Sequence, residues 1–227
     1  MEAQHLVSTR KLVDSDQEQA IVEDLIERVK PGDVAGSNGL HYLLATPFRY
    51  PPLRHGSRFG TRGEPSLWYG SREVRTAFAE FAYYRLLFLE GTAAELDPIT
   101  AEVAAFHVRV RTPRGVDLTA APFTAHRRAL SSPSRYASSQ GLGRKMRAEG
   151  VEAFRYFSAR DTEEGVNVAL FTPKAFAAHR PDRLETWHSR ADREGVEVRS
   201  RNLLERRGFV FPRTQFEVRG SLPAPAF

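Results

Sequence analysis

Hydrophobic and polar residues recur along the chain with two different periods, which predict where helices and strands lie. After "SDQE", where Ser15 is placed to cap a helix, apolar residues follow at helical spacing and predict a helix over 16–30 that Pro31-Gly32 ends. The short apolar run "LHYLLAT" (40–46) is expected to form a buried strand. Residues 47–66 are rich in Pro, Gly and Arg and predict a long loop.

The next segment predicts a strand, a helix and a second strand. "SLWYGS" (66–71) is expected to be a strand ending at Ser71, which would cap a helix over 72–90. The expected apolar face of that helix consists of Val74, Ala77, Phe78, Phe81, Leu87 and Phe88. Farther along, "EVAAFHVRV" (102–110) alternates apolar and polar positions, as a half-buried strand does.

The second half of the chain predicts one more helix and several strands. "SSPSRYASSQGLGRKMRAEG" is expected to form a helix opened by Pro133 and closed by Gly150, although its internal glycines weaken it. "VEAFRYFSAR" and "GVNVALFTP" are expected to be strands joined by the turn "DTEEG". In the tail, "PDRLETWHSRADREG" fits a charged helix or a surface excursion, "VEVRSR" and "QFEVRG" fit edge strands, and "SLPAPAF" is expected to be loose. These elements indicate an α+β fold with mixed or mostly antiparallel sheets and flanking helices.

Composition limits the class of protein. With 227 residues, of which 41% are hydrophobic, the chain can build one sizeable core, so a single domain over 1–227 is expected. No apolar run approaches the roughly 20 residues that span a bilayer, and the opening residues lack the pattern of a secretory signal, so a cytoplasmic protein without membrane contact is expected. The absence of cysteine excludes disulfides and thiolate chemistry, and the histidines lack metal-ligand spacing, so no metal is expected.

The net charge is +5, and almost all of the positive charge is arginine, because lysine occurs only at positions 11, 30, 145 and 174. Arginine suits phosphates and carboxylates, but a biased genomic base composition produces the same pattern, and we prefer that explanation. The arginines are spread along the chain beside 28 acidic residues and do not form a stripe with aromatic residues. Direct binding of nucleic acid is therefore not expected.

Arg58, Tyr69 and Glu80 follow one another at intervals of eleven residues. Glu80 falls at the border of the apolar face of its helix, where a carboxylate needs a partner. A surface salt bridge with Arg58 or Arg85 is the ordinary explanation, just as Ser158 is ordinarily a strand-ending serine. The competing explanation is a catalytic site, because an arginine in a Gly-rich loop and a tyrosine at a strand end converge on the same acid.

Taken together, "GSRFG", "SLWYGS" and "TAFAE", followed by "YASSQGLG" and "YFSARDTEEGVNVALF", resemble the RES domain family, named for its Arg, Glu and Ser. The resemblance covers about residues 40–172 and leaves a helix at 16–30 and a C-terminal extension at 173–227. It implies a fold related to the ADP-ribosyltransferases and a site that cleaves NAD⁺ between nicotinamide and ribose. For the toxins of Xre–RES toxin–antitoxin systems it implies phosphorolysis, which yields nicotinamide and ADP-ribose-1″-phosphate.

The resemblance also assigns roles to positions of this chain. The catalytic residues it implies are Glu80, Arg58, Tyr69 and Ser158. The substrate-binding residues it implies are Arg49, Tyr50 and Asn167. NAD⁺ is then the substrate and inorganic phosphate the co-substrate, with no cofactor. The implied partner is an Xre-type antitoxin that makes any DNA contact itself, and self-association is left open.

The chemistry gives these residue types a reason. Cleavage makes C1′ of the ribose resemble an oxocarbenium ion, which a fixed negative charge on Glu80 would stabilise more than the ground state. Arg58 would clamp the pyrophosphate or the incoming phosphate, Tyr69 would stack on nicotinamide or orient the ribose, and Ser158 would hold the carboxamide or a phosphate. Transfer to a protein, hydrolysis by water, and a non-catalytic basic binding module remain as alternatives.

Overall fold

A computed structural model of the protein describes residues 15–29, 31–32, 34–94, 98–202 and 204–224. The α-helices are α2 (Asp16–Val29), α3 (Tyr42–Arg49), α4 (Val74–Glu90), α5 (Arg127–Leu130) and α6 (Ala137–Ala148). The strands are β1 (Trp68–Ser71), β2 (Ile99–His107), β3 (Gly115–Asp117), β4 (Ala153–Phe157), β5 (Val166–Leu170), β6 (Arg183–Ala191), β7 (Gly195–Ser200) and β8 (Gly208–Pro212). Short 3₁₀ helices lie at η2 (Phe123–His126), η3 (Pro173–Ala175) and η4 (Arg213–Gln215).

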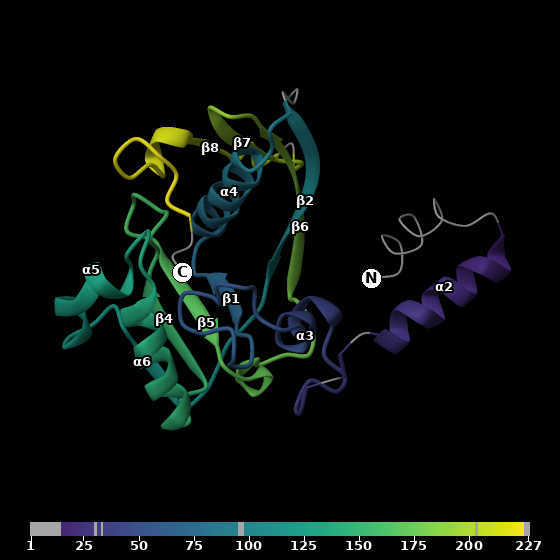
Figure 1. Ribbon diagram of the computed structural model, residues 1–227, viewed down its shortest axis with the longest axis horizontal. Helices are drawn as coiled ribbons and strands as arrows, with labels where there is room; N and C mark the ends of the chain where they lie inside the picture. The colour runs from purple at the N-terminus through teal and green to yellow at the C-terminus, as the bar shows by residue number, and fades with distance from the viewer. Residues whose placement is uncertain (1–14, 30, 33, 95–97, 203, 225–227) are drawn as a thin grey trace.

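Two four-stranded sheets form the body of the molecule (Figure 1). The first has the order β1-β5-β4-β3 and the second the order β2-β6-β7-β8. Every pairing is antiparallel except that of β3 with β4. In Figure 1, α4 runs beside the second sheet, α6 lies beside the first, and α2 stands apart from both. The α+β class expected from the sequence is confirmed.

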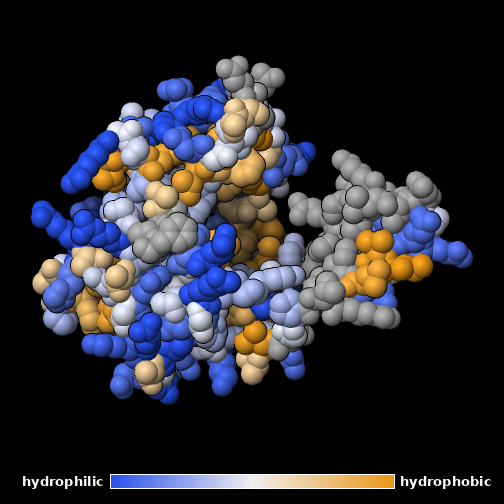
Figure 2. Space-filling view, viewed as in Figure 1, coloured by the Kyte–Doolittle hydropathy of each residue, from blue (hydrophilic) through white to orange (hydrophobic). Residues whose placement is uncertain are grey.

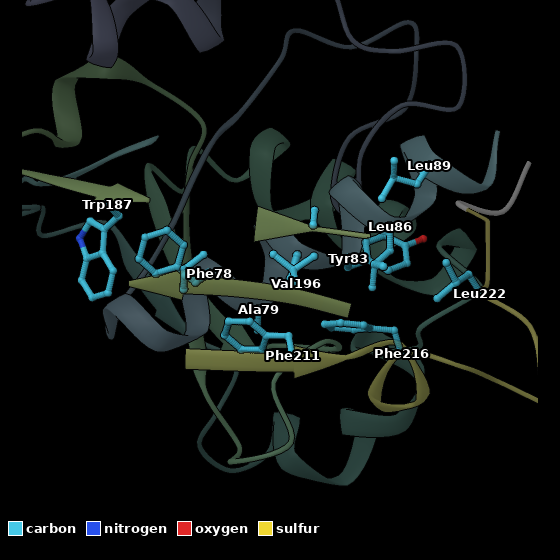
Figure 3. Close-up of a cluster of buried hydrophobic side chains, with 13 residues drawn as sticks. Phe78, Ala79, Tyr83, Leu86, Leu89, Trp187, Val196, Phe211, Phe216 and Leu222 are labelled. Atoms are coloured by element: carbon cyan, nitrogen blue, oxygen red, sulfur yellow. The ribbon is translucent and has the colours of Figure 1, made fainter. Parts of the chain in front are cut away.

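Helix α4 packs against the second sheet and makes the largest core (Figure 3). Its buried side chains are Thr76, Phe78, Ala79, Ala82, Tyr83, Leu86 and Leu89. Four residues of the predicted apolar face pack in this core, namely Val74, Phe78, Phe81 and Leu87, but the prediction was wrong for Ala77, which is exposed, and for Phe88, which is 59% exposed. The helix is apolar almost all round, so periodicity could not select the face that the sheet would cover.

The tail after residue 180 is more ordered than predicted. The segment expected to be a charged helix or an excursion is β6, whose residues alternate between exposed and buried and bury Trp187 completely. Two of its buried positions, Glu185 and Ser189, are polar, which hid the period of two from a hydrophobicity pattern. Strand β7 pairs with both β6 and β8, so the expectation of an edge strand there was wrong.

The last described residues also belong to the core. The strand expected in "QFEVRG" is not formed, because η4 occupies 213–215 and the preceding residues form β8. Leu222 packs in the α4 core, and the Tyr83 hydroxyl donates a hydrogen bond to the Pro223 carbonyl. The expectation of a loose end is therefore wrong for these two residues, and the rest of it, 225–227, lies outside the described residues.

Near the N-terminus, one prediction is confirmed and one is wrong. Helix α2 follows Ser15, whose Oγ accepts a hydrogen bond from the Glu18 amide at 3.2 Å, as a capping residue does. The predicted strand at 40–46 is instead part of α3, where the His41 ring accepts from the Leu43 amide. A short apolar run fits a buried strand or one face of a helix, and here it buries Leu44 and Phe48 on a helical face.

The remaining boundaries are close to expectation, with some shifts. Strands β1, β4 and β5 form within the predicted segments, whereas β2 (Ile99–His107) begins and ends earlier than the predicted strand at 102–110. Helix α6 begins at Ala137, later than Pro133 suggested, and Gly150 follows it with a φ of 69°. Ser71 does not cap α4, because Glu73 is the N-cap residue and the Ser71 hydroxyl bonds to Asn167 instead. Among the described helices, none has the length and apolar character required to cross a bilayer.

The α4 core predicts how strand β8 supports the fold. Phe211 is fully buried, so Phe211→Ala should lower the free energy of unfolding by about 3–5 kcal/mol through the cavity it leaves. The adjacent Val210 is 68% exposed, so Val210→Ala should change it by less than about 0.5 kcal/mol. Chemical denaturation of both variants checks this, and equal losses would mean that β8 is not packed as described.

Candidate active site

A cavity of about 400 Å³ lies at the open edge of β1, beside the middle of α4. Its lining residues come from the loop after α3, from β1 and α4, and from the first sheet: Pro47, Tyr50, Pro51, Pro52, Leu53, Gly56, Ser57, Arg58, Ser66, Leu67, Tyr69, Gly70, Ser71, Ala77, Glu80, Tyr84, Tyr136, Tyr156 and Asn167. Segments far apart in the sequence therefore meet around one hollow. Five of the lining residues are tyrosines: Tyr50, Tyr69, Tyr84, Tyr136 and Tyr156.

Glu80 is held in this cavity by two uncharged donors. Its Oε1 accepts a hydrogen bond from the Ser158 hydroxyl at 2.7 Å and another from the Asn167 amide nitrogen at 2.6 Å. The other end of the Asn167 amide accepts from the Ser71 hydroxyl at 2.6 Å, which fixes the orientation of the amide. None of the described residues donates to Oε2 of Glu80, which leaves that oxygen for a ligand.

The salt bridge offered as the ordinary explanation for Glu80 is not formed. Within the described part of the chain, no basic side chain lies within 4.0 Å of its carboxylate. Arg85 instead lies over the Phe81 ring, with its guanidinium carbon 5.2 Å from the ring centroid. Arg58 donates to the Ser132 carbonyl at 2.6 Å. The negative charge of Glu80 is therefore not neutralised by either candidate.

Ser158 is oriented by the turn that follows β4. Its Oγ accepts hydrogen bonds from the backbone amides of Arg160, at 3.0 Å, and Asp161, at 3.1 Å. A hydroxyl has a single proton, and here that proton is directed to Glu80. The Asp161 carboxylate ties the turn to α4, since it accepts from the Thr76 hydroxyl at 2.7 Å and pairs with Arg75.

Arg58 is a buried cation, with 8% of its surface exposed. Its guanidinium carbon lies 4.7 Å from the centroid of the Tyr136 ring. No acidic side chain among the described residues forms an ion pair with it, although burial of an unpaired charge is costly. A buried arginine whose charge is compensated only by a carbonyl and a ring is suited to bind an anion that enters the cavity.

Tyr69 holds the loop that carries Arg58. Its hydroxyl bonds to the Ser57 hydroxyl at 2.8 Å and accepts from the Phe59 amide at 3.2 Å, so it contacts both neighbours of Arg58. Burial raises the pKa of Tyr69 to about 12 and raises the pKa of Tyr156 well above its ordinary value. Both phenols therefore stay protonated at neutral pH, where they act as hydrogen-bonding groups and not as bases.

Helix α6 supports the same loop from the other side. The Gln140 amide donates to the Ser57 carbonyl at 3.0 Å, and a Cβ at Gly143 would lie 2.0 Å from the Phe59 carbonyl oxygen. The glycine that weakened the sequence-based prediction of this helix is thus the residue that allows α6 to approach the loop. Gly56 contributes a φ of 71° at the start of the loop.

The structure brings together most of the residues selected from the sequence. Arg58, Tyr69, Glu80, Tyr50 and Asn167 line the cavity, and Ser158 reaches it through its bond to Glu80. Arg49 is not among the described lining residues; its Nε donates to the Pro31 carbonyl. Its role in substrate binding stays a prediction, as do the roles of the others.

Sequence reasoning missed several residues of the site. Tyr84 follows Glu80 by one helical turn, so the sequence identified it as a neighbour of Glu80. The sequence did not indicate that Tyr84 lines the cavity. Tyr136, the ring beneath Arg58, begins the motif "YASSQGLG", but its contact with Arg58 could not be predicted because the two residues lie far apart in the sequence. Asp161 and Arg75, which fix the Ser158 turn, look like ordinary surface charges in the sequence.

The comparison with protein families identifies the chain. The family model of the RES domain matches residues 30–198, which is most of the protein, so the chain belongs to the RES domain family. The match extends beyond residue 172 into β7, so much of the predicted C-terminal extension is part of the family's unit. This membership supports a role like that of RES toxins and an antitoxin partner. A search of curated proteins found no match.

Two glycines of α6 provide a test of how the loop of Arg58 is supported. Gly143→Ala should lower the free energy of unfolding by roughly 1–3 kcal/mol, because its Cβ would meet the Phe59 backbone. At Gly141 a Cβ would meet nothing within 4 Å, so Gly141→Ala should raise it by about 0.5–1 kcal/mol through the better helix propensity of alanine. Denaturation curves of the two variants check the opposite signs; stabilisation by both would refute the close approach.

The raised pKa of Tyr69 predicts a loss of stability in alkali. Below pH 10 the phenol is protonated in both the folded and the unfolded chain. Between pH 10 and about 12 only the unfolded chain releases the proton, so the free energy of unfolding falls as the pH rises. Tyr69→Phe should be less stable than wild type at pH 8, because two hydrogen bonds are lost. At pH 11 this deficit should shrink by about 1 kcal/mol. A deficit that stays constant in denaturation at both pH values would contradict the assigned pKa.

Proposed function

We propose that this protein is a RES-type toxin that cleaves NAD⁺ at the bond between nicotinamide and ribose and transfers the ADP-ribosyl group to inorganic phosphate. The observation that supports this most directly is the state of Glu80. Its carboxylate lies in a cavity, is held by a hydroxyl and an amide, and has no basic partner among the described residues. Such an acid can direct its full charge at a substrate cation.

In the proposed reaction the bond between C1′ and the pyridinium nitrogen breaks, and its electron pair remains on the nitrogen of the released nicotinamide. The positive charge passes to C1′ and its ring oxygen, where the Glu80 carboxylate stabilises it. A phosphate oxygen then donates an electron pair to C1′, which forms ADP-ribose-1″-phosphate. Cleavage and capture together consume one phosphate for each nicotinamide released.

The other residues prepare this step. Ser158 and Asn167 hold the Glu80 carboxylate in one position before substrate binds, so no reorganisation is needed during bond cleavage. Arg58 is the group we assign to a phosphate, since its buried guanidinium lacks an acidic partner among the described residues. Tyr69 keeps Arg58 in place through its bonds to the backbone and side chain on either side of it.

The acceptor is the part of the proposal that the site residues define least. Water or a protein side chain can capture the same cation, and both would use Glu80 in the same way. Phosphorolysis is favoured by the buried Arg58, because an anionic acceptor gains from a nearby cation that water does not need. Product analysis with purified protein distinguishes the three: phosphorolysis requires phosphate in stoichiometric amount and gives a sugar phosphate.

Glu80→Gln tests the catalytic assignment, because the amide keeps the shape of the side chain and removes its charge. Nicotinamide release from NAD⁺ should fall by about a hundredfold or more, with an unchanged fold. Glu90→Gln, on the same helix but paired with Arg213 away from the cavity, should keep the wild-type rate. Wild-type turnover by Glu80→Gln would exclude this mechanism, and no release of nicotinamide by the wild-type protein would favour the non-catalytic binding module.

A further inference from the structure

A second hollow lies on the opposite face of the first sheet, at the same edge. This slot has a volume of about 380 Å³, within the range of about 300–1,000 Å³ usual for ligand sites. Figure 2 shows it as a depression with hydrophobic side chains in its depth, at the place where Figure 1 has α4 on one side and β2 and β6 on the other. Its walls consist mainly of Trp68, Val74, Ala104, Phe106, Val108 and Val168.

The slot is continuous in its lining with the cavity of Glu80. Tyr69, Gly70, Ser71 and Ala77 line both hollows. Successive side chains of a strand point to opposite faces, so Tyr69 packs with the core on the cavity side while Trp68 packs with the core on the slot side. Because β1 is the edge strand of its sheet, the two hollows meet around its open edge.

The border between the hollows is polar. The Arg72 amide donates to the Val166 carbonyl, and in an antiparallel pair the residues facing the partner alternate with residues facing away. The backbone amides and carbonyls of Tyr69 and Ser71 therefore face the open edge of β1. The exposed side chains of Arg72 and Glu73 and the ring of His107 stand at the rim of the slot.

These features match a flat base with apolar faces and a polar edge. A purine can lie against the Trp68 and Phe106 side of the slot while its edge bonds to the free backbone groups of β1. The cavity of Glu80 must hold the nicotinamide ribose and the phosphate acceptor, so the rest of a dinucleotide needs another place. The slot begins where the cavity ends. The cavity and the slot have similar volumes, so each can hold one base of a dinucleotide.

We propose that the slot between β1, α4 and β2 binds the adenine end of the NAD⁺ that is cleaved beside Glu80, and that the pyrophosphate passes over the open edge of β1 near Arg72. This assignment rests on the proposed function. It explains why an apolar hollow is maintained next to a catalytic cavity, and it makes the slot the determinant of selectivity for a dinucleotide over a mononucleotide.

Ala104→Leu tests the slot. Ala104 is exposed and lines the slot, so the larger leucine side chain at this position would fill the slot. The variant should bind AMP at least about tenfold more weakly in calorimetric titration, raise the KM for NAD⁺, and reduce the preference for NAD⁺ over nicotinamide mononucleotide by about tenfold. Thr100→Leu makes a similar change at an exposed position of the same strand outside the slot, and it should match wild type in all three measurements.

A measurement on the wild-type protein does not depend on the folding of a variant. The chain has two tryptophans: Trp68 lines the slot with 7% of its surface exposed, and Trp187 is fully buried in the α4 core. AMP bound in the slot should therefore quench the fluorescence of Trp68 and not that of Trp187. Absence of quenching up to millimolar AMP, or equal AMP affinity in Ala104→Leu and wild type, would overturn the assignment while leaving NAD⁺ cleavage standing. Binding of AMP in the slot without release of nicotinamide from NAD⁺ would instead refute the proposed function and keep the slot as a nucleotide site.

Discussion

The uncharged partners of Glu80 constrain the arrangement of everything around the cavity. A carboxylate inside a protein needs hydrogen bonds, and each bond to a charged acceptor contributes about 1.5–3 kcal/mol to stability. A basic side chain would supply such bonds most readily. A basic partner would also neutralise the charge that, in the proposed reaction, stabilises the cation formed at C1′. The Ser158 hydroxyl and the Asn167 amide both bond to Oε1 of the carboxylate without neutralising its charge. These two bonds link α4 to the end of β4 and to β5 at the cavity.

The turn after β4 shows how the protein separates two acids that lie close together. Asp161 forms an ion pair with Arg75 and accepts a hydrogen bond from the Thr76 hydroxyl, and its side chain is 2% exposed. The same turn presents the Ser158 hydroxyl to Glu80, whose helix carries Arg75 and Thr76 on the preceding turn. The nearby cation, Arg75, therefore neutralises Asp161, and the charge of Glu80 is not neutralised. A close approach at Gly165, where a Cβ would lie 2.3 Å from Asp161, keeps this turn compact.

Local patterns in the sequence predicted the parts of the fold that depend on neighbouring residues. The cap at Ser15 and the strands flanking "DTEEG" follow from turn chemistry and alternation, and the structure contains them. The parts that were wrong depend on distant residues: α3 was taken for a strand, and β6 was hidden by its buried Glu185, which is satisfied by Arg207 and His107. Spacing in the sequence did select Arg58, Tyr69 and Glu80, but it could not reveal that Tyr69 holds the loop of Arg58 or that Tyr136 lies under its guanidinium.

Helix α4 connects the stability of the protein to its proposed chemistry. One side of it packs Phe78, Ala82 and Leu86 on the second sheet, while Ala77, Glu80 and Tyr84 line the cavity on the other side. The residues after 172 supply β6, β7 and β8, which are the surface that α4 packs against. Without that surface α4 would have no fixed position, and the carboxylate of Glu80 could not be aligned with Ser158 and Asn167. The C-terminal part of the chain is therefore required for the site even though none of the described cavity residues comes from it.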